Sequence, residues 1–290
     1  MAVSDEISPL AFPDMWAALA AGFRRTHRQG PFVAGSVLEH VGPRSVVLGT
    51  PHRRLTYVTL DHDGLMPGGL SVTPDGFEAL RQSLAATALG KQIPSWLGSL
   101  ELPPRTDLSL TSRAVDPGQV ALLVRGLSGL PSARTGLPGD PEVRLLAGQL
   151  VQSLARAGSR ERALATLIGV GAGTTPAGDD LIVGVMAGLI LTGRTRDHAV
   201  VSRLLPPLLP RTTRASRHFL GWAMRGQFAT PVLRLCEALG GTADLTTAMT
   251  RLRRWGASSG VDLMHGLAAA LADRRSGGSD LPINDLGRAS

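Results

Sequence analysis

The chain has 290 residues, and its 43% hydrophobic and 18% charged residues are typical of a folded globular protein, not a disordered one. Cys236 is the only cysteine, which excludes an intrachain disulfide and a cysteine metal cluster. The net charge of +7 invites a nucleic-acid interpretation, but short arginine groups and an aromatic content of only 4% argue against nucleic acid as a partner.

The first 130 residues predict a mixed domain built on a small β-sheet. β-Branched and apolar runs are broken by Gly, Pro and arginine pairs, which is typical of strands and turns. We expect a helix over 14–27, strands within 32–60, a turn-rich stretch over 61–76, a helix over 76–89, and a strand or short helix over 119–127.

A Gly- and Pro-rich stretch, residues 131–142, predicts a linker, and nearly everything beyond it has helical periodicity. The expected helices cover 142–158, 159–169, 181–191, 215–225, 231–239, 245–255 and 263–273. Residues 274–290 are expected to form a loose tail. The fold class is therefore α+β, with a β-containing N-terminal domain (1–130) followed by an all-α helical domain (143–273).

No targeting or membrane segment is expected. The N-terminal residues lack a basic start followed by an apolar run, which a signal peptide would have. The most apolar segment, 181–191, is too short to span a bilayer, which needs about 20 residues. We therefore expect a soluble, cytoplasmic protein.

The stretch GVGAGTTPAGDDLIVG, residues 169–184, predicts a loop followed by a helix start. Thr175 is the expected N-cap, with proline at the first helical position. Asp179 and Asp180 would then lie in the first turn, where the helix dipole favours negative charge. A tight connection between two helices would explain these residues without any ligand.

The same loop also has the features of an anion site. Gly171 and Gly173 leave backbone amides open to a ligand, and Thr174 and Thr175 add hydroxyl groups. No lysine follows the last loop glycine, which excludes a P-loop, and the preceding segment is helical, which excludes a dinucleotide fingerprint. A pocket for a small anion or carboxylate remains.

A second stretch repeats the pattern. GDDLIVG (178–184) and GVDLMHG (260–266) share G-x-D-L-x-x-G, and hydroxyl residues stand shortly before each copy. Either the likeness is common helix-start chemistry, or two helix N-termini converge on one site with Asp180 and Asp262 in matching roles. The candidate residues of the second copy are Ser258, Ser259, Gly260 and Asp262.

The segment RTTRASRHF, residues 211–219, lies between the two copies. Thr212 or Thr213 is expected to cap the following helix, and Arg214 is a candidate anion contact beside Thr213. His218 and His265 are either general acids or bases or ordinary helix residues. Ser258 is also the centre of a G-x-S-x-G pattern, but a nucleophile elbow needs a preceding strand and a helix is expected there.

These motifs resemble a bacterial family long catalogued as a domain of unknown function. GVGAGTTPAGDD resembles its G-x-G-x-G-x-T-P-x-G-D-D signature, and GASSGVDLMHGL is similar to its G-x-S-S-G-x-D-x-x-x-G segment. The likeness extends over about residues 30–272. The family includes a subunit of the oxamate carbamoyltransferase of anaerobic allantoin degradation.

The resemblance implies a purine-catabolism transferase subunit that converts oxalurate and phosphate to oxamate and carbamoyl phosphate together with partner subunits, without metal or cofactor. The implied catalytic residues are Asp179, Asp180 and Asp262, and the implied substrate-binding residues are Gly171, Gly173, Thr174, Thr175, Gly178, Thr213, Arg214, Ser258, Ser259 and Gly260. The chain has Ala177 and Ala257 where serine and histidine are common in the family. This departure favours an alternative, a non-catalytic small-carboxylate-binding or assembly protein.

An amide-bearing anion would divide the work of the adjacent aspartates. One carboxylate would hold the loop by accepting hydrogen bonds from its backbone or a threonine hydroxyl. The other would accept N–H donors from a carbamoyl or oxamate group. The sequence does not say which aspartate has which task.

Overall fold

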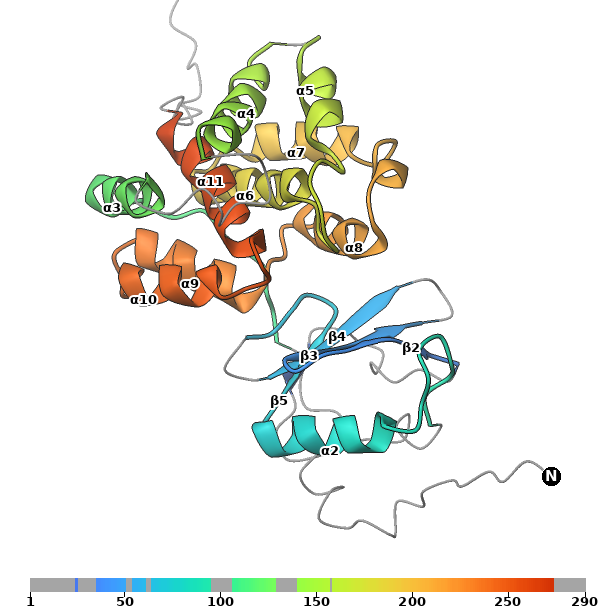
Figure 1. The fold of residues 1–290 in the computed structure, drawn as a ribbon. Helices are drawn as coiled ribbons and strands as arrows, with labels where there is room; N and C mark the ends of the chain where they lie inside the picture. The colour runs from blue at the N-terminus through green and yellow to red at the C-terminus, as the bar shows by residue number, and fades with distance from the viewer. Residues whose placement is uncertain are drawn as a thin grey trace, which may run out of the picture.

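The computed structural model describes residues 24–25, 35–50, 54–60, 64–94, 106–128, 140–156 and 158–273. A helix, α2 (Pro74–Leu84), a β-sheet and a body of helices lie one above another (Figure 1). The predicted α+β class is confirmed, with strands first and helices after them.

The sheet has five strands in the order β1-β5-β4-β3-β2. Its strands are β1 (Arg24–Arg25), β2 (Val37–Val41), β3 (Ser45–Gly49), β4 (Leu55–Leu60) and β5 (Leu70–Val72). β2, β3 and β4 form an antiparallel meander, whereas β5 pairs with β4 in parallel and with β1 antiparallel. The strands predicted within 32–60 are confirmed.

Two strands lie where the sequence predicts something else. β5 falls in the stretch 61–76, which is rich in turn residues; only three residues extend between those turns, and all three are buried in the sheet. β1 falls in the helix predicted over 14–27, because backbone pairing with β5 overrides local propensity there. The rest of that predicted helix lies outside the described residues.

The sheet is covered on both faces, so its interior strand β3 is buried over most of its length. One face packs on α2, which begins after the N-cap Thr73, whose hydroxyl accepts a hydrogen bond from the Gly76 amide. Phe77 and Leu80 of α2 join strand residues such as Leu48 and Val58 in one hydrophobic cluster. The other face is turned to the helices (Figure 1).

The helical body comprises α3 (Pro117–Ser128), α4 (Asp140–Ser153), α5 (Arg160–Leu167), α6 (Ala177–Leu191), α7 (Thr195–Leu204), α8 (Arg214–Ala223), α9 (Thr230–Leu239), α10 (Leu245–Arg253) and α11 (Ser259–Ala272). α3 resolves the ambiguity over 119–127 in favour of a helix. It packs against α9, α10 and α11, although the sequence places it with the N-terminal domain. α4 begins inside the predicted linker, and residues 131–139 of that linker lie outside the described residues.

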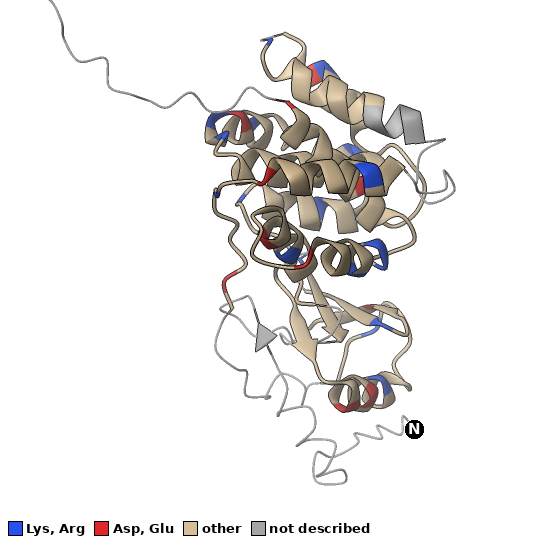
Figure 2. Cartoon of the chain, turned by 90° about the vertical axis from the view of Figure 1, so that its left-hand side faces the viewer, with Lys and Arg blue, Asp and Glu red and all other residues tan. Residues whose placement is uncertain are grey.

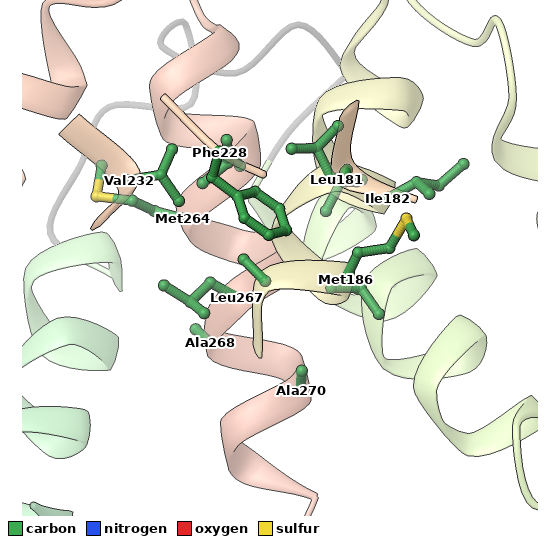
Figure 3. Packing of buried hydrophobic residues seen from close by; sticks show 14 of the residues in the cluster. Leu181, Ile182, Met186, Phe228, Val232, Met264, Leu267, Ala268 and Ala270 are labelled. Carbon is green, nitrogen blue, oxygen red and sulfur yellow. The ribbon is translucent and has the colours of Figure 1, made fainter. Parts of the chain in front are cut away.

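α6 and α11 cross at the centre of the helical body (Figure 3). Every residue of α6 is buried, which explains its unbroken apolar sequence. A Cβ atom on Gly184 would lie 2.0 Å from the Leu263 carbonyl oxygen, and one on Gly266 would lie 2.1 Å from the Leu181 carbonyl oxygen. Each copy of G-x-D-L-x-x-G thus places its last glycine against the leucine backbone of the other copy.

Candidate functional site

A cleft of about 1380 Å³ lies between the sheet and the helical body. Strands β2, β3 and β4 line it from one side. The loop before α6 and the starts of α6, α8, α9 and α11 line it from the other, together with the end of α10. Both motif copies therefore reach the same cleft.

The two helix N-termini meet through their hydroxyl residues. The Thr175 Oγ1 and Ser259 Oγ atoms are 2.8 Å apart, a hydrogen bond between residues 84 positions apart in the chain. Thr175 therefore does not cap α6 as predicted, because its hydroxyl is turned toward α11 and Pro176 occupies the N-cap. Thr175, Ser259 and Asp180 all line the cleft.

Asp180 is a buried acid at this wall of the cleft, only 7% exposed. Burial raises the pKa of its carboxyl group to about 8, and the nearby charges of Asp262 and Asp179 add to the rise, against hydrogen bonds from Ser259 and Thr175. Its Oδ2 atom is buried and has no hydrogen-bond partner. A buried polar atom without a partner in a ligand-sized cleft is the property expected of a group that binds or reacts with a ligand.

Asp179, the preceding residue, has a structural task. Its Oδ1 atom accepts a hydrogen bond from the Gly169 amide at 2.9 Å, and its Oδ2 atom accepts one from the Thr212 hydroxyl. The carboxylate thereby ties the start of the glycine loop to the segment before α8. Asp179 is buried and does not line the cleft.

Thr213 and Arg214 form a further part of the cleft wall. Thr213 caps α8 as predicted, with its hydroxyl accepting from the Ser216 amide at 3.1 Å and donating to the Thr174 carbonyl oxygen at 2.6 Å. Arg214 forms a salt bridge with Glu39 of β2. This bridge joins the helices to the sheet across the cleft.

Arginine dominates the charge of the cleft. Arg44, Arg214, Arg234, Arg251 and Arg254 line it, against the acids Glu39 and Asp180. Arg44 lies beside the end of α10, where its Nη1 atom donates to the Arg254 carbonyl oxygen at 3.1 Å. The cleft therefore favours an anionic ligand. Elsewhere the Lys and Arg positions are scattered over several elements (Figure 2).

Several predicted site residues do not line the cleft. Gly171 and Gly173 are exposed and have positive φ angles of 113° and 97°, which shape the loop. A Cβ atom on Gly178 or Gly260 would lie 2.0 or 1.7 Å from a carbonyl oxygen of the preceding helix, so both permit close packing. Ser258 stands just before α11, and Asp262 is fully buried beside Asp180.

Neither candidate histidine lines the cleft. The Nε2 atom of His218 lies 2.8 Å from the Pro67 carbonyl oxygen, and burial lowers its pKa to about 4, so the neutral ring donates this hydrogen bond. His265 is buried in α11. A helix, α10, precedes Ser258, so the strand that a nucleophile elbow needs is missing there.

The sheet wall of the cleft was not predicted. Glu39 and Tyr57 line it, and Tyr57, the only tyrosine of the chain, also contacts the rings of His218 and Phe219. The residues of the sheet wall alternate along ordinary strands, and no sequence motif distinguishes them from other strand residues. Only the arrangement of sheet and helices shows that they face the glycine loop.

The helical part of the chain is similar to a known family. Residues 167–271 match the model of a family described as oxamate carbamoyltransferase subunit AllH. The matched region contains both motif copies, the Thr175–Ser259 contact and Asp180, whereas the sheet wall lies outside it. No curated protein and no solved structure matches the chain.

Neither a membrane-spanning helix nor a metal-binding cluster is found among the described residues. None of their helices combines the length and apolar character that crossing a membrane requires. They also contain no group of three or more His, Cys, Asp or Glu side chains placed to hold a metal ion.

Proposed function

We propose that this chain is a subunit of an oxamate carbamoyltransferase-like enzyme and that its cleft binds a small anionic amide, oxamate or oxalurate. The reaction interconverts oxalurate and phosphate with oxamate and carbamoyl phosphate. The observation that carries the proposal is the buried Asp180, whose partnerless Oδ2 atom lies at a cleft rich in arginine. The family match supports the same reaction.

The cleft has a group for each part of such a ligand. Oxamate and oxalurate both carry a carboxylate and amide N–H donors. The arginines suit the carboxylate of either ligand, and ionised Asp180 suits the N–H donors of oxamate. Thr175 and Ser259 add hydroxyls beside Asp180. Asp179 cannot share this task because both of its oxygens are engaged within the protein.

Calorimetry with oxamate on the full-length chain, with any partner subunits, tests this proposal at pH 8.5, where Asp180 is largely ionised. Asp180→Asn keeps the size of the side chain but removes its charge and replaces an acceptor with a donor. We expect it to weaken binding by about 1.5–3 kcal/mol, the range for a charge-assisted hydrogen bond. Unchanged affinity in a folded variant would contradict the assignment of Asp180.

Asp116→Asn is the matched control. Asp116 is exposed before α3 and does not line the cleft, so its replacement removes a charge without touching the site. Oxamate affinity should stay at the wild-type value. Binding without turnover in the assembled complex would favour the alternative, a non-catalytic carboxylate-binding or assembly subunit.

A further inference from the structure

The proposed reaction requires a proton to move at an amide nitrogen. The lone pair of an amide is delocalised into its carbonyl group, so the nitrogen of oxamate attacks a carbonyl carbon only if its proton is removed as the new bond forms. In the reverse direction the same nitrogen leaves oxalurate and must gain a proton. One group beside that nitrogen can serve both directions.

We propose that Asp180 is this group: its Oδ2 atom accepts the proton of the oxamate nitrogen during carbamoylation and returns it when oxalurate is cleaved. The inference rests on the proposed function and adds proton transfer to it. It is carried by the position of Oδ2, which is buried at the cleft without a protein partner.

The atoms and electrons balance through Asp180. The oxamate nitrogen bonds to the carbonyl carbon of carbamoyl phosphate, and the bond from that carbon to the phosphate oxygen breaks with its electron pair on phosphate. The N–H proton passes to the Asp180 carboxylate. Asp180 then transfers this proton to the phosphate, which leaves as hydrogenphosphate, and the carboxylate is ready again.

The surroundings of Asp180 suit it to both protonation states. Asp262 on α11 and Asp179 on α6 place negative charge nearby, which favours the protonated form together with burial. The hydroxyls of Ser259 and Thr175 hydrogen-bond the carboxyl group and favour the ionised form. A proton shuttle works best when its pKa is close to the working pH, and the balance of these groups gives about 8.

The other acid that lines the cleft among the described residues does not meet these conditions. Glu39 is about one third exposed and is held in its salt bridge with Arg214. Its carboxylate is thus already engaged within the protein, whereas the Asp180 Oδ2 atom has no hydrogen-bond partner. Asp180 is therefore the group to test.

The two ligands should differ in their proton balance. Oxamate is bound by the ionised carboxylate, so at pH 7, where free Asp180 is largely protonated, its binding should release close to one proton. Oxalurate is bound by the protonated carboxyl group and should release almost none. Titration calorimetry at pH 7 in PIPES and in Tris, which differ in ionisation enthalpy, measures this release for each ligand on the full-length chain, alone and with any partner subunits.

The outcomes separate the inference from the function on which it rests. Release with oxamate but not with oxalurate supports both, and Asp180→Asn should abolish the difference while leaving measurable binding. Binding of both ligands with equal proton release overturns the inference alone. Failure of both ligands to bind overturns the proposed function and the inference together. The wild-type comparison is decisive even if the variant does not fold.

Discussion

Asp179 and Asp180 are adjacent on the first turn of α6, yet their surroundings give them different tasks. Asp179 accepts hydrogen bonds from the Gly169 amide and the Thr212 hydroxyl. Asp180 keeps one oxygen without a partner at the cleft. The sequence predicts that one aspartate holds the loop and the other contacts the ligand. Asp179 holds the loop, and the ligand contact of Asp180 stays a prediction.

The raised pKa of Asp180 predicts that the protein loses stability as the pH rises toward 8. The unfolded chain releases this proton near the ordinary value of 3.8, whereas the folded protein retains it until about 8. Below pH 6.5 the opposite effect of His218, whose pKa is lowered to about 4, offsets the loss. Between pH 6.5 and 8 the pH dependence of stability from these two groups comes mainly from Asp180.

The expected net loss in that window is roughly 1–1.5 kcal/mol, because the slope of about 1.4 kcal/mol for each pH unit falls as Asp180 ionises near pH 8. Urea unfolding at pH 6.5 and pH 8 measures it, and Asp180→Asn should show a much smaller difference. An equal pH dependence in both proteins would refute the raised pKa.

The neighbours of Asp180 should shift its pKa in opposite directions. Asp262→Asn removes a nearby negative charge and should lower the pKa of Asp180, whereas Ser259→Ala removes a hydrogen bond to the carboxyl group and should raise it. Carbon-13 NMR titration of labelled aspartate carboxyl groups, assigned with Asp180→Asn, follows both shifts. Shifts in the same direction would contradict this account of the site.

At the scale of elements, the α6–α11 crossing depends on glycine. Gly184→Ala would place a Cβ atom 2.0 Å from the Leu263 carbonyl oxygen, so the helices must separate. We expect a loss of unfolding free energy on the order of 3 kcal/mol by urea denaturation, the upper part of the range for overpacked cores.

Gly148→Ala on α4 is the control for this prediction. No atom lies within 4 Å of a Cβ atom built there, and alanine is a better helix former than glycine. This variant should gain about 0.5–1 kcal/mol. Similar effects of the two substitutions would show that helix propensity, and not close packing, decides at Gly184.

Long elements with clear periodicity were predictable, and short ones were not. α9 and α10 begin within one residue of their predicted starts because apolar spacing and a proline or an aspartate mark those starts. α7 was not predicted, because in its charged sequence only Val201 is fully buried. β5 is too short to show a period of its own.

The helical wall of the site was predictable because its residues recur in two copies. The shared pattern correctly places the starts of α6 and α11 together, as the Thr175–Ser259 contact shows. It also suggests equal roles for Asp180 and Asp262, but only Asp180 lines the cleft, whereas Asp262 is fully buried. Which of the two aspartates lines the cleft depends on the position of the sheet. That position is set by contacts between residues far apart in the chain, so the local pattern does not predict it.

At the scale of the whole molecule, the described residues form two main hydrophobic cores. One core lies between the sheet and α2 and the other within the helical body. A small cluster of Val47, Leu55 and Ala215 lies where the sheet meets α8. Tyr57 packs against both this cluster and the helical core, with its ring centroid 5.2 Å from that of His218 and 5.1 Å from that of Phe219.

Tyr57→Ala should therefore uncouple the two parts. We expect differential scanning calorimetry to show two separate unfolding transitions in this variant and a single one in the wild type. Tyr57→Phe keeps the ring contacts and should retain a single transition. A single transition in all three proteins would show that other contacts join the cores.

The crossing of α6 and α11 also determines which wall of the cleft can move. Thr175, Asp180 and Ser259 stand at the N-terminal ends of α6 and α11, whose backbones touch, so this wall cannot shift without separating the two helices. The opposite wall, formed by the sheet, contacts the helical body through the Arg214–Glu39 salt bridge, Tyr57 and backbone hydrogen bonds such as that from the Thr230 amide to the Leu65 carbonyl oxygen. A ligand should therefore enter and leave by movement of the sheet wall, while the helical wall stays in place.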